Sequence, residues 1–391
     1  MTVVDLFSGC GGFSQGFYLA GFDIICAIDH WITARNTIQM NHGTKLQNEP
    51  LMIESNYDIE KISKLPDSKF NAIIPDSDII IGSPPCVSFS NSNRSGNVNK
   101  DLGKRLIEAF WLIVARKKDK KGSILKYWIM ENVPRSEQYI QDQYEFIKDK
   151  NGYEGQRKKR LHIEDVKANN SAVYDSSEYG VPSKRLRYIC GHFEKPNKVT
   201  NNLDELKLGS ILKAIKQNGQ KMTQDPVWKD LELETDDITD HGYERKLAEW
   251  EWKKAKRQKR DKGYMGQMSF PENENAISRT IMSFGATASR EAFILRNKRG
   301  FRAPTIREYA TLMSFPLNYD FAGVSHNVKQ KQIGNAVPPK FSYQLATAIR
   351  KRKKPILRRL RSQTKKDDDF VDLKKQKFEK RIEIKSRNSF E

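Results

Sequence analysis

One cysteine of the chain stands where a rigid backbone could present it to a ligand. Cys86 lies in the segment GSPPCVSFS, residues 82–90, directly after a run of isoleucines. Proline restricts backbone φ, so the two prolines stiffen the approach to Cys86. A cysteine is the most nucleophilic side chain near neutral pH when its pKa is lowered. Cys86 is therefore a candidate nucleophile, and the alternative is a small buried side chain, the usual state of a free cysteine.

A carboxyl group ends a second apolar run. Glu131 lies in the segment MENVPR, residues 130–135. Burying a carboxyl group is costly unless it is paired or protonated, which makes Glu131 a candidate acid. If both runs are parallel strands, Cys86 and Glu131 reach the same sheet edge, where they suit attack on an electron-poor ring and protonation at a ring nitrogen. The alternative is a structural carboxylate that bonds backbone amides in the next loop.

A glycine-rich loop near the start of the chain is the third candidate site. Residues 5–13 read DLFSGCGGF, between an apolar run and a helical pattern. Glycines allow a tight turn and a close ligand, and the helix N-terminus that follows favours a carboxylate or phosphate. Asp29 ends the next apolar run roughly 20 residues on, where an acid accepts hydrogen bonds from ribose. The pair indicates an adenosine-containing cofactor, and the alternatives are a plain turn and a helix N-cap.

The elements that must position these residues alternate between strand and helix. Strand-like apolar runs occupy residues 2–7, 22–29, 78–84 and 127–133. Helical patterns occupy residues 13–21, 31–41 and 105–116. This alternation predicts an α/β fold with a Rossmann-like, mostly parallel sheet. The ligand crevice of such a sheet lies at the carboxyl ends of its strands, where Cys86 and Glu131 are expected.

From about residue 191 the pattern becomes mixed and polar. Residues 244–262 are a charged helical candidate. Strand-like patterns follow at 276–284 and 291–296, and helical patterns at 305–315 and 339–352. We expect four regions: a catalytic domain over 1–190, a smaller mixed domain over 191–300, a bridging segment with a returning helix over 301–350, and a basic tail over 351–391.

Composition narrows the function classes. The formal net charge of +20 favours a polyanionic partner such as nucleic acid, although solubility alone is an alternative explanation. No apolar run approaches the length of a membrane span, and the first strand begins too early to leave room for a leader peptide. We therefore expect a cytoplasmic, nucleoid-associated protein. The four cysteines form no CxxC pair and the six histidines are scattered, so no metal site is expected.

Six segments, in this order, resemble motifs of the bacterial DNA (cytosine-5)-methyltransferases of restriction–modification systems. They are DLFSGCGG, SPPCVSFS, ENV, SKRLRY, RAPTIREYATLMSFP and QIGNAVPP, and they run from residue 5 to residue 339. The resemblance implies transfer of a methyl group from S-adenosylmethionine to carbon 5 of a flipped cytosine in double-stranded DNA. It also implies a Rossmann-like methyltransferase domain with a smaller target-recognition domain, a monomer, and a partner restriction endonuclease.

The resemblance implies a role for each matching residue. Cys86 would attack carbon 6 of cytosine, and Glu131 would protonate or hydrogen-bond ring N3. Arg185 and Arg187 would hold Glu131 and the edge of the base, while Asn132 would shape the pocket. The residues implied to line the cofactor site are Phe7, Gly9, Gly11, Asp29, Trp31, Asp58, Asn335 and Val337. Among these, Asp29 would bind the ribose and Trp31 would stack on the adenine.

Two segments of the resemblance carry no catalytic expectation. The family usually has glutamine two residues before its first motif arginine, and here that position is Ser183. We expect this difference to alter local packing without removing activity, because both arginines remain. In the segment TIREYATLMSFP, core positions are expected at Leu312, Met313 and Phe315. Arg307 and Glu308 are expected to brace the two domains.

DNA contacts are expected in two regions. The loop 88–100 is rich in Ser, Asn and Gly and is expected to close over the flipped base; the alternative is an ordinary surface loop. Its Ser88, Ser90 and Arg94 are expected to bind DNA, with Arg94 and Lys100 at phosphates. Candidate base contacts in the recognition region are Arg279, Ser283, Thr287, Ser289 and Arg290. At least half of such polar residues are expected to meet phosphates or water instead. The charged stretch 244–262 suits a solvated helix or a backbone clamp, and the tail suits salt-sensitive, non-specific binding.

Three other functions remain open on sequence alone. The same chemistry could act on RNA, which competition between DNA and transfer RNA would reveal. A catalytically inactive DNA-binding protein could retain the fold, although the intact Cys86, Glu131 and Arg187 argue against it. A dinucleotide oxidoreductase would explain the glycine-rich loop, but neither the PPC nor the ENV segment.

Overall fold

The computed structural model describes residues 1–42, 58–85, 100–148, 159–215, 224–231, 244–260 and 266–350. These residues all lie in one compact unit. Four of the predicted site residues, Cys86, Ser88, Ser90 and Arg94, lie outside the described residues, as does the tail 351–391.

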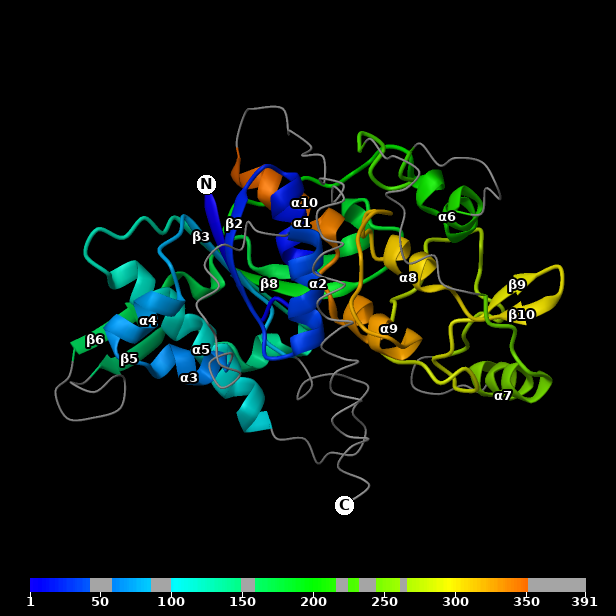
Figure 1. Cartoon of the computed structure of the whole chain (residues 1–391), viewed down its shortest axis with the longest axis horizontal. Helices are drawn as coiled ribbons and strands as arrows, with labels where there is room; N and C mark the ends of the chain where they lie inside the picture. Colours follow the sequence, from blue (N-terminus) through cyan, green and yellow to red (C-terminus); the bar gives the residue numbers. More distant parts are fainter. Residues whose placement is uncertain are drawn as a thin grey trace, which may run out of the picture. The chain divides into compact units, whose positions relative to one another are not determined.

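A twisted sheet forms the centre of the described chain (Figure 1). Its six strands follow the order β2-β1-β3-β4-β8-β7. Their bounds are β1 Thr2–Leu6, β2 Asp23–Ile28, β3 Ile79–Gly82, β4 Tyr127–Asn132, β7 Ala172–Asp175 and β8 Leu186–His192. The first four strands in this order pair in parallel, and β8 pairs antiparallel with both β4 and β7. The predicted α/β class with a mostly parallel sheet is confirmed.

Each face of the sheet has its own hydrophobic core, because successive side chains of a strand point to opposite faces. In β3, Ile79 and Ile81 join one core and Ile80 joins the other. The helices over the first face include α1 Gly12–Leu19 and α10 Pro339–Ile349. The second face is covered by α5 Lys100–Asp119 with α3 Ile59–Lys64 and α4 Asp67–Ile73. The antiparallel pair β5 Tyr144–Lys148 and β6 Lys159–Ile163 also packs on this second face. Helix α2 Ile32–His42 lies beside α1, with the ring centres of His42 and Tyr18 5.2 Å apart.

Two glycines allow α1 and α10 to pack closely. A Cβ atom at Gly16 would lie 2.4 Å from the carbonyl oxygen of Pro339, and one at Gly12 would lie 2.2 Å from that of Val337. Real Cβ atoms do not approach backbone this closely, so any other residue would force the helices apart. The helical pattern predicted at 339–352 is thus a helix that returns to the first turn of the chain.

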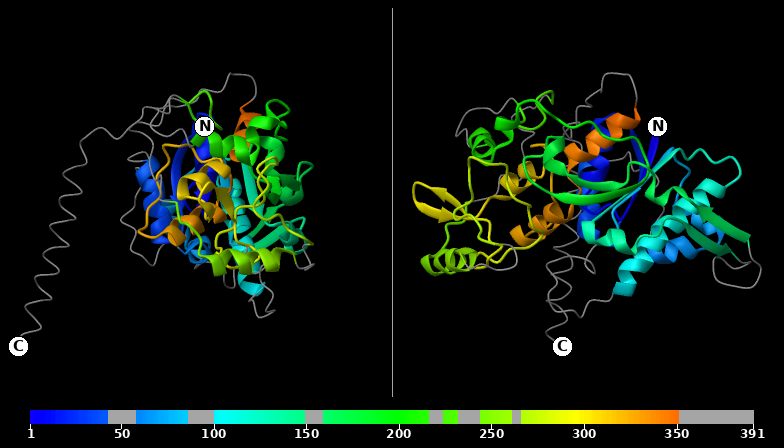
Figure 2. Two further views of the ribbon diagram at one scale, coloured as in Figure 1. Left: turned by 90° about the vertical axis from the view of Figure 1, so that its right-hand side faces the viewer. Right: turned by 180° about the vertical axis from the view of Figure 1, so that it is seen from behind.

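The second part of the unit contains four helices and a hairpin among its described residues. Its helices are α6 Leu208–Ile215, α7 Glu249–Arg260, α8 Ile306–Leu312 and α9 His326–Asn335. Its strands are the hairpin β9 Leu295–Asn297 and β10 Gly300–Arg302. Short 3₁₀ turns occur at Pro134–Tyr139, Asp165–Lys167, Ser176–Tyr179 and Leu203–Leu206. Figures 1 and 2 both show α7 and the hairpin together, away from the central sheet.

The strand predicted at 276–284 is wrong. Only isolated bridges form there, between Ser183 and Ser278 and between Lys207 and Ile277. The strand predicted at 291–296 begins only at Leu295. The apolar pattern of segment 276–284 does not come from strand pairing. It arises because Ile281 is buried, while the chain on either side of it is anchored to separate elements.

No helix among the described residues is long and apolar enough to cross a membrane. The same residues contain no group of three or more His, Cys, Asp or Glu side chains that could hold a metal ion.

Candidate active site

The segment that leads to Cys86 is fixed at the carboxyl edge of the sheet. Directly after β3, the Ser83 amide donates to the carbonyl oxygen of Leu6 at 3.2 Å, and its hydroxyl donates to that of Phe7 at 3.1 Å. The buried Asn132 side chain, at the end of β4, donates to the carbonyl oxygen of Pro84 at 3.1 Å. The end of β4 and the glycine-rich loop therefore both hold the backbone just before Cys86.

Glu131 forms an ion pair with Arg187, which is one of the two ways in which a buried carboxyl group can be accommodated. Its Oε1 lies 2.8 Å from Nε of Arg187, and only 8% and 16% of the two side chains are exposed. The pair forms because β4 and β8 are antiparallel neighbours. Glu131 lies opposite Ile189, and Arg187, two residues from Ile189, projects from the same face. A carboxyl group thus stands in a fixed position at the edge where Pro84 is anchored.

Arg185 lies in the turn before β8 and is also buried. Its amide donates to Asp175 at 3.1 Å, and its guanidinium lies 3.5 Å from the carbonyl oxygen of Ile281. The structure therefore places this side chain between the sheet edge and the backbone at Ile281. Ser183 is fully buried and donates to the carbonyl oxygen of Leu312 at 2.8 Å, so the short side chain fits against α8.

The segment 278–283 carries Arg279, and we call it the recognition segment after its predicted role. It is docked between the Arg185 turn and α9. The Lys184 amide donates to the carbonyl oxygen of Ser278 at 2.8 Å, and Thr280 donates back to that of Lys184 at 2.7 Å. On the other side, a Cβ atom at Gly334 of α9 would lie 2.3 Å from the Ser283 nitrogen. This close docking replaces the sheet pairing that the sequence pattern predicted.

The glycine-rich loop is held by Asp29. One Asp29 oxygen accepts from the Gly9 amide at 2.9 Å and the other from the Trp31 amide at 2.8 Å. Phe7, Gly9 and Gly11 all have positive φ, which the turn requires. Asp29 therefore caps the start of α2, as one of the sequence alternatives predicted. Each of its carboxylate oxygens also retains a lone pair that could accept a hydrogen bond from a ribose hydroxyl.

The loop fits a polar ligand. A Cβ atom at Gly9 would meet nothing within 4 Å, so the tip of the loop borders open space. Within the described chain, three buried groups beside it lack a hydrogen-bond partner: Asp5 Oδ1, Ser8 Oγ and the Gln15 amide. Burial raises the pKa of Asp5 to about 7, and the Ser14 hydroxyl, 2.5 Å away, offsets this only in part. Sequence reasoning missed Asp5, although an acid inside an apolar strand before a glycine-rich loop is a signal for it.

The other predicted cofactor residues surround this loop or flank undescribed chain. Trp31 is half-buried with the Lys331 ammonium 5.0 Å from its ring centre, Asn335 ends α9, and Val337 is buried. Asp58 caps α3, accepting from the Lys61 amide at 3.3 Å.

Gln332 links α9 to the loop and was also missed by sequence reasoning. Its carbonyl oxygen accepts from the Cys10 thiol at 3.4 Å and its side chain from the Thr37 hydroxyl at 2.5 Å. The position of Gln332 at the start of the motif QIGNAVPP is the one sequence signal that could have predicted this role.

The predicted base-contacting arginines are engaged inside the recognition region. Arg279 donates to both Glu272 oxygens at 3.1 Å and to the Glu291 carbonyl oxygen at 2.7 Å. Arg290 donates to the carbonyl oxygen of Gln258 at 2.6 Å, and the Ser289 amide closes a turn onto Ala286. As base contacts, these three residues stay a prediction.

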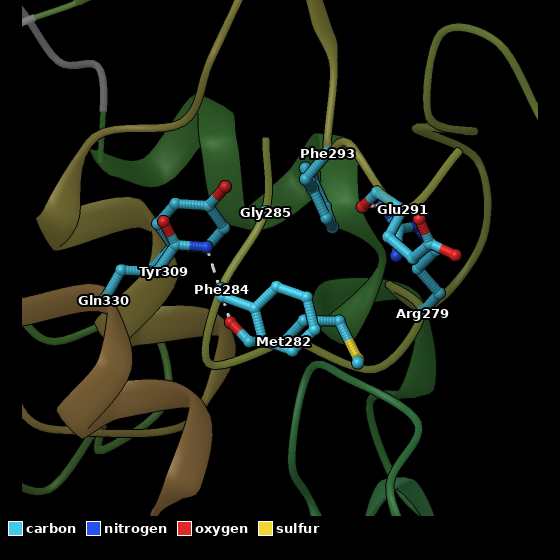
Figure 3. Close-up of a pocket in the computed structure, with 8 residues that line it drawn as sticks. All are labelled: Arg279, Met282, Phe284, Gly285, Glu291, Phe293, Tyr309 and Gln330. Atoms are coloured by element: carbon cyan, nitrogen blue, oxygen red, sulfur yellow. Dashed lines mark hydrogen bonds between the residues drawn. The ribbon is translucent and has the colours of Figure 1, made fainter. Parts of the chain in front are cut away.

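A small pocket lies beside Arg279 (Figure 3). Arg279 and Glu291 line one side of it, and Tyr309 and Gln330 line the other. Its cavity volume of about 10 Å³ corresponds to about one water molecule, so it does not accommodate a nucleobase.

The three cysteines that the structure describes are all buried and free: Cys10, Cys26 and Cys190. Burial raises the pKa of each thiol, that of Cys26 to about 12. A thiol that stays protonated near neutral pH is a poor nucleophile, so none of these three suits covalent catalysis.

Comparisons with known proteins agree with this geometry. The family model for C-5 cytosine-specific DNA methylases matches residues 1–351. The chain is 30% identical to the type II methyltransferase M.NgoFVII of Neisseria gonorrhoeae, over 89% of this chain and 86% of that protein. It is 28% identical to the type II methyltransferase M.HgiDI of Herpetosiphon aurantiacus, over 89% and 94%. A candidate DNA modification methyltransferase from an E. coli prophage shares the fold, with a TM-score of 0.57 at 18% identity over 90% of this chain and 98% of that one.

Proposed function

The chain belongs to the C-5 cytosine-specific DNA methylase family, and from this premise we propose that it methylates a flipped-out cytosine through a covalent adduct with Cys86. It is a DNA (cytosine-5-)-methyltransferase of the type II restriction–modification kind, so its substrate is duplex DNA. The proposal concerns how its own residues carry out this reaction.

Cys86 attacks carbon 6 of the cytosine. Two facts support it as the nucleophile: the other three thiols are buried with raised pKa values, and the backbone before Cys86 is anchored through Ser83 and Pro84. Attack moves the ring electrons toward N3, where Glu131 donates a proton or a hydrogen bond. Arg187 keeps the Glu131 carboxyl group in place through their 2.8 Å ion pair. Arg185 and Asn132 complete the pocket wall.

Carbon 5 then carries the electron density of an enamine and is methylated. S-adenosylmethionine supplies, when bound, an electrophilic methyl group on a sulfonium. The residues that would hold it are Phe7, Gly9, Gly11, Asp29, Trp31, Asp58, Asn335 and Val337. The open space at Gly9 and the unpaired buried groups at Asp5, Ser8 and Gln15 support a polar ligand at this loop. Loss of the carbon 5 proton, return of the N3 proton to Glu131 and expulsion of the Cys86 thiolate release 5-methylcytosine.

Substrate handling follows from the same proposal. The target atom lies inside the base stack, so the cytosine must leave the duplex, and Ser88, Ser90 and Arg94 would close over it. We also propose a monomer that works on chromosomal DNA in the cytoplasm, with a restriction endonuclease as its partner in the same system.

The observation that carries the proposal is the Glu131–Arg187 ion pair at the edge where Pro84 is anchored. The test is transfer of labelled methyl groups from S-adenosylmethionine to unmethylated plasmid, with the product base identified by mass. The native chain should form 5-methylcytosine, and Cys86→Ala should form none while still binding DNA. Labelling of transfer RNA with no labelling of DNA would contradict the substrate. An active Cys86→Ala variant would contradict the mechanism.

A further inference from the structure

The charged helix α7 turns one face inward and the opposite face to solvent. Its buried residues, Glu251, Ala255 and Lys259, follow one another at intervals of four and so lie on one side of the helix. Among them, Ala255 packs in a small core with Leu247 and with Ala292, Ile294 and Ala303, which flank the β9–β10 hairpin in sequence. This periodicity fixes which side chains of α7 can meet a partner.

The inward face fastens α7 to the recognition segment. The Lys259 ammonium is fully buried 2.8 Å from Glu272, and the same carboxylate binds Arg279 at 3.1 Å. Arg290 adds a hydrogen bond of 2.6 Å to the carbonyl oxygen of Gln258. The two arginines expected to read bases thus hold this helix in a fixed position beside the segment that docks on Arg185.

The outward face is basic. We call the residues Trp250, Lys253, Lys254, Arg257 and Arg260 the α7 outer face, and all five are exposed. Glu249 pairs with Lys253 at 2.5 Å. Within the described chain, no acidic side chain pairs with Lys254, Arg257 or Arg260. These three cations are therefore available to an external partner, whereas Lys259, Arg279 and Arg290 bind groups of the protein itself.

The position of α7 relative to the sheet suits a DNA partner. In Figures 1 and 2 the chain enters β1 near the top, at the N label, and α7 lies at the lower end of the recognition region. β3 and β4 run parallel to β1, so their carboxyl ends face that same side; Pro84 follows the end of β3, and Glu131 lies near the end of β4. A duplex bound at this edge would therefore lie on the side of the molecule to which α7 belongs.

We propose that the α7 outer face binds the DNA sugar–phosphate backbone without reading sequence. Cations on a solvent-exposed helix face match the regular negative charge of duplex DNA, and phosphate contacts fix the position of a protein on the duplex while carrying no sequence information. The inference rests on the proposed function, because it takes duplex DNA as the partner.

The test compares two triple variants of the full chain. Lys254, Arg257 and Arg260 are changed to glutamine in one, and Arg296, Lys298 and Arg299 of the β9–β10 hairpin in the other. The control removes the same number of exposed cations from the same region. Binding to a labelled duplex is measured by fluorescence anisotropy over a series of NaCl concentrations, and the methylated sites are mapped by bisulfite sequencing.

Each phosphate contact contributes about 0.9 to the slope of log K against log salt. The slope of log K against log salt should therefore be shallower by about 2 to 3 in the α7 variant than in the native chain. The KM of the variant for DNA should be higher, and it should methylate the same sites at an unchanged single-turnover rate. Equal slopes in the native chain and the α7 variant would overturn the proposal, as would an equal loss in the hairpin variant. Lost affinity for transfer RNA with unchanged affinity for duplex would also overturn it. A native chain that binds no duplex would instead overturn the proposed function.

Discussion

At the scale of single residues, the active site depends on how burial divides its ionisable groups. Three thiols are buried with raised pKa values, whereas the buried Glu131 has an arginine partner. The chemistry is therefore assigned by environment as much as by residue type, and each assignment can be tested separately.

The native protein should expose a single reactive thiol. Iodoacetamide reacts with thiolates, and burial keeps Cys10, Cys26 and Cys190 protonated and out of reach. We expect mass spectrometry of the native protein to find one alkylated cysteine, Cys86, and the Cys86→Ser variant to remain unmodified until urea unfolds it. Rapid labelling of Cys10 or Cys190 in the folded protein would contradict this assignment.

Glu131 and Arg187 should act as a unit. Removing a general acid typically lowers a rate by about 10²- to 10⁴-fold, and we expect a loss in that range for Glu131→Gln in single-turnover methyl transfer. Arg187→Gln should cause a comparable loss alone but little further loss in the double variant, because its effect operates through Glu131. Losses that multiply in the double variant would show that the two side chains contribute independently.

Asp5 should make the fold less stable as the pH rises. Its pKa is raised from 3.8 to about 7 by burial, so the folded state keeps a proton that the unfolded state loses. The stabilising effect of this proton is complete below pH 4 and is lost as the pH rises through 7. Relative to the native chain, Asp5→Asn should gain up to roughly 4 kcal/mol in the free energy of unfolding between pH 4 and pH 8.

Urea unfolding at several pH values measures this difference, with Asp78→Asn as a control of opposite sign. Burial opposes ionisation of Asp78 too, but its hydrogen bonds with Lys126 and Thr2 leave its pKa below the usual range. That variant should lose stability above pH 4. A constant difference between Asp5→Asn and the native chain would rule out titration of Asp5.

At the scale of elements, glycines decide which segments can lie against each other. Gly16 lets α10 pack on α1, and Gly334 lets α9 contact the Met282–Ser283 backbone. Neither contact could be predicted from hydrophobic periodicity, because a glycine gives no apolar signal. Both join segments far apart in sequence, and both support the loop or the recognition segment of the proposed site.

Replacing Gly16 by alanine should destabilise the fold although alanine favours helix. The added Cβ would lie 2.4 Å from Pro339 and 2.5 Å from Ser342, and overpacking of this kind costs about 1 to 3 kcal/mol. Thermal unfolding should show a lower Tm. Gly285→Ala is the control, since a Cβ there meets only the Gln330 side chain at 3.6 Å. An unchanged Tm for Gly16→Ala would show that α10 can shift at little cost.

At the scale of the whole molecule, the sequence predicted the parallel sheet well, because each buried strand is a short apolar run followed by a glycine or an acid. The antiparallel strand β7 has only four residues, and half of them are exposed, so its pattern gives no periodic signal. The segment 276–284 misled the prediction because its buried residues dock on two different elements. The hydrogen bonds of Arg279 and Arg290 could not be predicted, because no sequence motif marks their partners, Glu272 and Gln258.

The packing of α10 on α1 has a consequence for synthesis. Leu19 and Pro339 are about 320 positions apart, and ribosomes add about 5 to 20 residues each second. The glycine-lined face of α1 therefore remains uncovered for roughly 15 to 65 s, until α10 has been synthesised. During that time the nascent chain carries an incomplete loop for its cofactor and an uncovered apolar face. A stalled or truncated translation product that lacks α10 would thus be a target for chaperones and proteases, and a partly made enzyme would leave DNA unmodified.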